Sequence, residues 1–138
     1  MHQISAAIIP LKFWKSILWS VIIAIGLFTP GDKLPERKLF QLEHLDKILH
    51  LLIFGFLQFL ILFDMYSGRI IITKKRMIQS IFICTGYGVL TEIIQYLLIS
   101  KRNGSILDLI ADITGIILAV VFFFLLKKPI DRFFPRKI

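Results

Sequence analysis

The sequence has one cysteine, few acidic residues and no segment with the pattern of a soluble domain. The single cysteine, Cys84, excludes an internal disulfide, and its place within an apolar run predicts a small buried packing residue. Only 9 Asp and Glu residues stand against 17 Lys and Arg residues, so the formal net charge is +8. Internal repeats, low-complexity tracts and the alternating segments of about ten residues that build a membrane β-barrel are all missing. These absences leave an apolar helical protein as the simplest fold class.

Apolar residues make up 57% of the sequence, with 13 Phe among them, and they gather in four runs separated by short charged stretches. A helix needs about 20 mostly apolar residues to cross roughly 30 Å of hydrocarbon. The runs predict membrane spans at residues 11–28, 47–66, 77–100 and 107–126. We therefore expect one domain over residues 1–138, an all-α, membrane-embedded four-helix bundle with up-down-up-down topology.

The basic residues are distributed unevenly between the two sides of the predicted bundle. One side has Lys12, Lys15, Arg69, Lys74, Lys75, Arg76, Lys127, Lys128, Arg132, Arg136 and Lys137, and the other has Lys33, Arg37, Lys38, Lys47, Lys101 and Arg102. The positive-inside rule then predicts that both termini are cytoplasmic. The segment Thr29-Pro30-Gly31-Asp32 lacks a small-x-small cleavage site, so we expect the first span to be an uncleaved signal anchor. Basic charge beside anionic headgroups serves topology and anchoring, so no nucleic-acid partner is expected.

Ionisable and amide side chains occur near one end of three predicted spans. They are Asp46, Lys47 and His50 in the second span, Glu92 and Gln95 in the third, Arg102 in the third loop, and Asp108 and Asp112 in the fourth span. With alternating topology, all of them fall near the outer face of the membrane. Each charge at the centre of a span costs about 2.5–3.5 kcal/mol, and such residues usually face the bundle interior and mark function.

A purely structural interpretation of these residues is a polar network that ties the helices together. Such interhelical hydrogen bonds average about 0.6 kcal/mol, which is small against the cost of inserting four carboxylates. Small residues add a packing prediction, because Gly86, Gly88 and Gly115 would allow close helix contact. We interpret the polar residues as a candidate site and leave the structural network as the alternative.

The arrangement of these residues resembles the VanZ-like family of small bacterial membrane proteins. The resemblance rests on the segment from Asp46 through His50 to Phe54, on Gly88-x-x-x-Glu92-x-x-Gln95, and on Arg102 followed by Asp108-Leu109-x-x-Asp112-x-x-Gly115. It implies a multi-pass protein of the bacterial cell membrane, in a family named for a link to teicoplanin resistance. The family more often has Asn at the position of Asp112.

Three functions remain open from the sequence. The first is binding of a membrane lipid or a lipid-linked cell-wall precursor, with an influence on the envelope and its glycopeptide response; the ligand-binding candidates are Lys47, His50, Glu92, Gln95, Arg102, Asp108 and Asp112. The second is a membrane enzyme acting on a lipid-linked substrate, with Asp46, His50 and Glu92 as catalytic candidates. Asp46 lies four residues before His50, a spacing that would let it orient His50 as a general base, and Glu92 would act as an acid. The third is a small transporter or proton pathway.

No phosphatase, protease or transferase motif and no nucleophilic Ser or Cys arrangement supports one enzyme class over another. No organic cofactor is expected. Glu92, Asp108 and Asp112 are candidate ligands for a divalent cation, because carboxylate oxygens suit Mg²⁺ or Ca²⁺. The oligomeric state is left open by the sequence.

Overall fold

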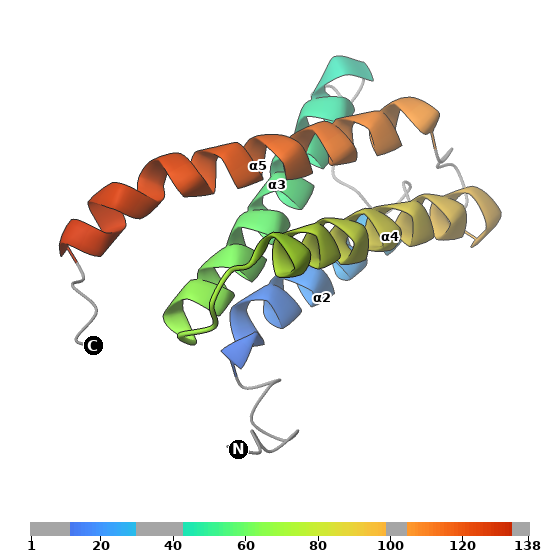
Figure 1. Ribbon diagram of the computed structural model, residues 1–138. Coiled ribbons are helices and arrows are strands. Elements are labelled where there is room, and N and C mark those ends of the chain that lie inside the picture. Colours follow the sequence, from blue (N-terminus) through green and yellow to red (C-terminus); the bar gives the residue numbers. More distant parts are fainter. Residues whose placement is uncertain (1–11, 30–42, 99–104, 134–138) are drawn as a thin grey trace.

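The computed structural model describes residues 12–29, 43–98 and 105–133. These residues form four helices: α2 (Trp14–Phe28), α3 (Glu43–Ser67), α4 (Lys74–Leu98) and α5 (Ile106–Phe133). Figure 1 shows α5 crossing α3, with α4 below α5 and α2 below α4. The predicted all-α bundle of four helices is confirmed, and the three later helices begin and end within a few residues of the predicted spans, except that α5 continues beyond 126.

Three of the four helices are long and apolar enough to cross a membrane, namely α3, α4 and α5. The helix α2 has 15 residues, which gives a length of about 22 Å at 1.5 Å per residue. It is therefore shorter than the predicted span 11–28, whose first residue lies outside the described residues. Its C-cap Thr29 is extended, with ψ 123°, as expected for a residue that precedes a proline.

The helix ends alternate along the bundle, as the contacts between helices show. The start of α2 meets the end of α3, where the Nζ of Lys15 lies 2.9 Å from Asp64. The end of α2 meets the end of α4, where the side chain of Gln95 donates a hydrogen bond of 3.1 Å to the carbonyl of Leu27. The up-down-up-down arrangement follows, while the cytoplasmic location of the termini stays a prediction.

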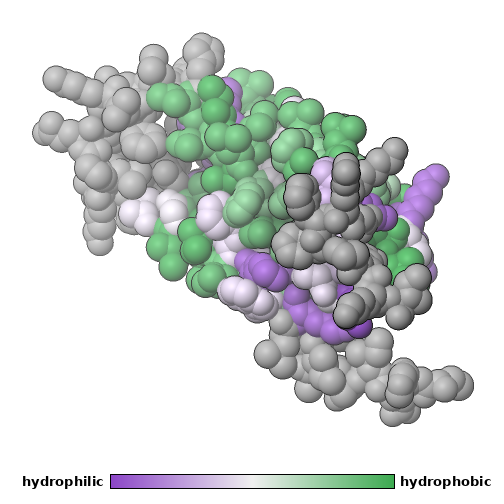
Figure 2. All heavy atoms as spheres, turned by 90° about the vertical axis from the view of Figure 1, so that its left-hand side faces the viewer, coloured by the Kyte–Doolittle hydropathy of each residue, from purple (hydrophilic) through white to green (hydrophobic). Residues whose placement is uncertain are grey.

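The interior of the bundle is unusually polar. Among the described residues, ten buried ones are polar or charged: Ser16, His50, Gln58, Asp64, Ser80, Thr91, Glu92, Gln95, Asp108 and Asp112. Large apolar side chains lie outside instead, such as Phe82, Leu98 and Ile106, which are each more than 70% exposed. Figure 2 shows hydrophobic residues over much of the face that it presents. A surface this apolar around a polar interior fits a lipid environment, because only a hydrocarbon solvent removes the cost of exposing it.

The apolar core is small and lies between the polar residues. One cluster contains Ile23, Leu27, Phe54, Leu57, Cys84 and Ile116, and a second contains Leu62, Tyr66 and Phe123. Cys84 is buried at 1% exposure and packs in the first of these clusters, which confirms its predicted role.

Glycines allow the backbones of α3 and α5 to touch. A Cβ at Gly55 would lie 3.0 Å from the carbonyl oxygen of Gly115, and a Cβ at Gly115 would overlap the carbonyl oxygen of Leu51. The predicted close contact is thus confirmed for Gly115. It was wrong for Gly86, where nothing lies within 4 Å of an added Cβ.

Candidate functional site

Five ionisable residues from three helices meet at the end of the bundle where α3 and α5 begin and α4 ends. We call them the polar cluster: Asp46 and His50 from α3, Glu92 from α4, and Asp108 and Asp112 from α5. His50 is 3% exposed, Glu92 7%, Asp108 5% and Asp112 0%. The prediction that three helices deliver ionisable groups to one level is confirmed.

The imidazole of His50 lies at the centre of the polar cluster. Its Nδ1 is 3.0 Å from Oδ1 of Asp112 and 3.6 Å from Oε1 of Glu92. Because an ionised carboxylate only accepts hydrogen bonds, Nδ1–H donates to Asp112 when this carboxylate is charged. Phe54, one turn later on α3, stacks on the ring with centroids 6.3 Å apart. The hydrogen bond and the stacking together hold the imidazole in one orientation.

Glu92 connects the end of α4 to the start of α5. Its Oε2 accepts a hydrogen bond of 2.8 Å from the backbone N–H of Ser105, the residue before α5. The hydroxyl of Ser105 in turn accepts the N–H of Leu107 at 3.1 Å, which caps the first turn of α5. The carboxylate therefore has one oxygen engaged by the chain and the other, Oε1, directed at His50.

Three oxygens of the polar cluster have no hydrogen-bond partner among the described residues, although they are buried. They are Oε1 of Glu92, Oδ1 of Asp108 and Oδ2 of Asp112. A buried polar group without a partner costs about 1–3 kcal/mol, and more when it is charged. Such groups in a native structure call for a partner that the described residues do not supply, such as a proton, a water molecule, an ion or a ligand.

The remaining candidate residues take different positions. Lys47 is half-buried and interacts electrostatically with Asp108. Asp46 has an oxygen within 4.8 Å of both a His50 ring nitrogen and an Asp108 oxygen. Gln95 is buried, but its amide nitrogen hydrogen-bonds the backbone of α2 at Leu27, away from His50. Arg102 lies outside the described residues, so its place relative to the polar cluster stays a prediction.

A second polar site, at the opposite end of the bundle, was missed in the sequence. Asp64 is 0% exposed and accepts hydrogen bonds from Nζ of Lys15 at 2.9 Å, from the backbone N–H of Ser16 at 3.0 Å and from its hydroxyl at 2.7 Å. A signal was available, since an antiparallel pairing of the first two spans places residue 15 beside residue 64.

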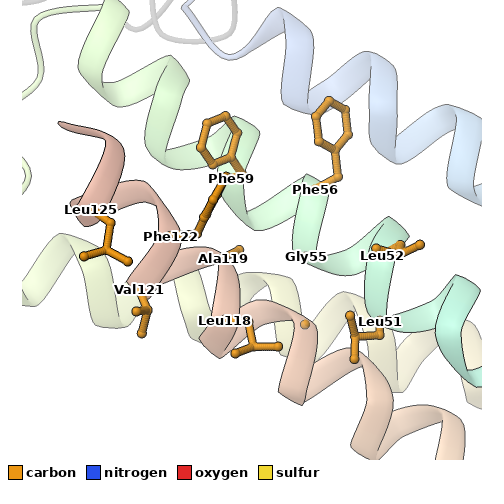
Figure 3. A pocket seen from close by; sticks show the side chains of 11 residues that line it. Leu51, Leu52, Gly55, Phe56, Phe59, Leu118, Ala119, Val121, Phe122 and Leu125 are labelled. Carbon is orange, nitrogen blue, oxygen red and sulfur yellow. The ribbon is translucent and has the colours of Figure 1, made fainter. Parts of the chain in front are cut away.

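Two apolar hollows open on the surface beside the polar cluster. One of about 290 Å³ lies between α4 and α5 and is lined by Val89, Glu92, Ile93, Tyr96, Leu97, Ser105, Ile106 and Leu109. The other, of about 500 Å³, lies between α3 and α5 (Figure 3) and its lining is entirely apolar or glycine, from Leu51 to Phe59 and from Gly115 to Leu125. The smaller hollow is the one that matters for chemistry, because Glu92 belongs both to it and to the polar cluster.

Comparison with known proteins gives the family of the chain. A family model described as VanZ/LLP1 matches residues 1–127. The chain belongs to the VanZ/LLP1 family. Neither a curated protein nor a solved structure matches it.

The geometry gives a physical reason for several residues on which the resemblance to VanZ-like proteins rests. Phe54 stacks on His50, and Gly115 lets α5 approach Leu51 of α3. A Cβ at Gly88 would lie 3.1 Å from Oδ2 of Asp112, so glycine leaves room for that carboxylate beside α4. In this VanZ/LLP1 protein these three motif residues thus orient His50 or make space for the polar cluster.

Proposed function

We propose that this VanZ/LLP1 protein binds the headgroup of a membrane lipid or lipid-linked cell-wall precursor at the polar cluster, in the outer leaflet of the bacterial cell membrane. The observation that carries the proposal is the position of Glu92. Its carboxylate is part of the buried polar cluster and also lines the apolar hollow between α4 and α5. An amphiphile could therefore place its polar part at Glu92 while its apolar part stays in contact with hydrocarbon.

The larger hollow offers a second apolar surface to such a ligand. The groove between α3 and α5 begins at Leu51 and Gly115, next to His50 and less than one turn after Asp112. Its exposed Leu52, Phe56 and Phe122 offer contact to a hydrocarbon chain, as Figure 3 shows for side chains from both helices. Ligand sites of this kind combine a mostly apolar wall with a few polar groups that provide specificity.

The chemistry of the polar cluster suits a headgroup with hydroxyl or amino donors. Glu92, Asp108 and Asp112 each present a buried oxygen that lacks a partner among the described residues. Lys47, beside Asp108, adds a cation that suits a phosphate oxygen. The outer-leaflet location is supported by the excess of basic residues on the opposite side.

Lipid binding should depend on Glu92. In nanodiscs, the wild-type protein is expected to retain a polyprenyl phosphate, a lipid-linked disaccharide or an anionic phospholipid selectively, measured by native mass spectrometry. Glu92→Gln should weaken this retention about tenfold or more, because a hydrogen bond to a charged group contributes about 1.5–3 kcal/mol. Asp64→Asn is the matched control, since it neutralises a buried carboxylate at the opposite end of the bundle. Equal retention by wild type and Glu92→Gln would contradict the proposal.

A cellular consequence follows if the bound lipid is an envelope component. Expression of the wild-type protein in a glycopeptide-sensitive bacterium should shift its teicoplanin sensitivity, and Glu92→Gln should abolish that shift at equal protein level. An unchanged sensitivity with both proteins would limit the function to lipid binding.

The hydrogen bond between His50 and Asp112 favours a second candidate, a membrane enzyme acting on a lipid-linked substrate. A histidine oriented by a carboxylate is a common arrangement for a general base. Here the carboxylate that hydrogen-bonds to Nδ1 of His50 is Asp112 of α5, although the sequence spacing favoured Asp46. Turnover of a lipid-phosphate or lipid-sugar substrate that is lost in His50→Gln would support this candidate, and absence of turnover with binding intact would reject it.

A further inference from the structure

The spacing of donor atoms in the polar cluster is that of a metal site. His50, Glu92 and Asp112 each offer one ligand atom, and these atoms lie within 4.8 Å of one another. The distances from Nδ1 of His50 are 3.0 Å to Asp112 and 3.6 Å to Glu92. Donors that all lie about 2.1 Å from one cation are separated by roughly 3.0 Å at octahedral and 3.4 Å at tetrahedral angles. Both distances from Nδ1 of His50 fall close to this spacing, and the ligand atoms of Glu92 and Asp112 lie within 4.8 Å of each other.

The unpartnered oxygens provide a second, independent observation. Oε1 of Glu92 and Oδ2 of Asp112 have no hydrogen-bond partner among the described residues, and the two side chains are at least nine-tenths buried. Oε1 of Glu92 is directed at the same Nδ1 of His50 that faces Asp112. A cation among these atoms would satisfy oxygens that the described part of the chain leaves without a donor.

Charge balance also favours a cation. Three buried carboxylates, Glu92, Asp108 and Asp112, and the less buried Asp46 lie around His50. Among the described residues, Lys47 interacts electrostatically with Asp108. Burying carboxylates without compensation is costly, because their mutual repulsion and lost hydration are both large in a low-dielectric interior. A charge of +2 at the centre would offset two of the four carboxylates.

We propose that His50, Glu92 and Asp112 bind one divalent transition-metal cation, of the Zn²⁺ or Mn²⁺ class. An imidazole nitrogen beside two carboxylates selects these ions over Mg²⁺ and Ca²⁺, which prefer oxygen ligands alone. This proposal differs from the sequence expectation of Glu92, Asp108 and Asp112 in two ways, because it adds the nitrogen ligand of His50 and places Asp108 outside the ligand set. The site shares Glu92 and Asp112 with the proposed headgroup site, and it goes beyond the proposed function because cation binding needs no lipid.

Asp46 and Asp108 complete the arrangement. They form a second group with His50, in which one ligand atom of each lies within 4.8 Å of the others. When Nδ1 binds the cation, the imidazole carries its hydrogen on Nε2, and this N–H needs an acceptor. Carboxylates commonly accept the second N–H of a metal-bound histidine and hold the ring in place. Asp46 and Asp108 are therefore assigned as positioning residues.

The proposal is tested by metal binding alone. The full-length protein is reconstituted in nanodiscs, stripped with a chelator and titrated with Co²⁺, whose visible absorption reports its ligands. Metal content is then measured after dialysis against Zn²⁺, Mn²⁺, Mg²⁺ or Ca²⁺. We expect about one Zn²⁺ or Mn²⁺ per chain. Asp112→Asn and Glu92→Gln should each bind at least tenfold more weakly, and Asp64→Asn should bind like wild type.

Helicity and a single size-exclusion peak establish that each variant is folded. Metal binding should also raise the melting temperature of the wild-type protein, and this measurement needs no variant. Uptake of no metal by folded wild type, a preference for Mg²⁺ or Ca²⁺, or undiminished uptake by folded Asp112→Asn and Glu92→Gln would overturn the site. Lipid retention in the chelated sample separates the two proposals. Retention without metal uptake overturns the metal site alone, and metal uptake without retention overturns the proposed function alone.

Discussion

Gly115→Ala is expected to destabilise the bundle by about 3 kcal/mol or more, among the largest effects of any single methyl group in this protein. An added Cβ would overlap the carbonyl oxygen of Leu51 and lie 2.9 Å from its carbonyl carbon. These are backbone atoms of a helix, so no side-chain rotation can relieve the contact. The two helices must move apart instead, and the polar cluster, which joins His50 of α3 to Asp112 of α5, must open with them.

The matched control is Gly86→Ala, also a glycine-to-alanine change within a spanning helix. Nothing lies within 4 Å of the added Cβ at Gly86, and alanine favours a helix by about 1 kcal/mol over glycine. This variant should therefore unfold at the wild-type temperature or slightly above it. Thermal unfolding in detergent micelles, followed by circular dichroism, measures both variants. Equal melting temperatures for the two would contradict the close crossing of α3 and α5.

Asp64→Ala is expected to cost about 2–3 kcal/mol, because it removes a fully buried acceptor and leaves the donors of Ser16 unsatisfied, while the side chain of Lys15 is 30% exposed and can reach water. The carboxylate accepts hydrogen bonds from Lys15 and from both the backbone and the hydroxyl of Ser16, and it is fully buried. Without it, the donors of Ser16 at the start of α2 face the side of α3 with no acceptor. We therefore expect α2 to detach before α3, α4 and α5 unfold.

Two further variants separate the buried ion pair from general effects of charge. Asp64→Asn keeps an oxygen that can accept from Ser16, so its loss of stability should be clearly smaller than that of Asp64→Ala. Lys75→Met removes an exposed basic residue at the start of α4, and should change the unfolding free energy by no more than about 0.5 kcal/mol. Denaturant unfolding in mixed micelles compares the three. A similar small loss for all of them would show that Asp64 does not anchor α2.

The spans and the level of the candidate site were predictable because both depend on position along the chain. Hydrocarbon sets the length of a helix, and alternating topology then places His50, Glu92 and Asp112 at one end. The partners of these residues were not predictable in the same way. Helix spacing pointed from His50 to Asp46 on its own helix, whereas the hydrogen bond is made by Asp112, 62 residues away. Gln95 likewise shares a helix with Glu92 but bonds to α2.

The sequence by itself determined the all-helical architecture, the apolar exterior and the family, since each follows from composition and from motifs read along one chain. Only the tertiary structure decided which carboxylate orients His50, which oxygens remain without a partner, and that Asp64 forms a second buried polar site. The physical reason is that helix rotation and crossing select these contacts. Glycine at the crossing lets the backbones of α3 and α5 touch. A shift of a few tenths of an ångström between these helices is enough to form or break a hydrogen bond or a contact with a metal ion.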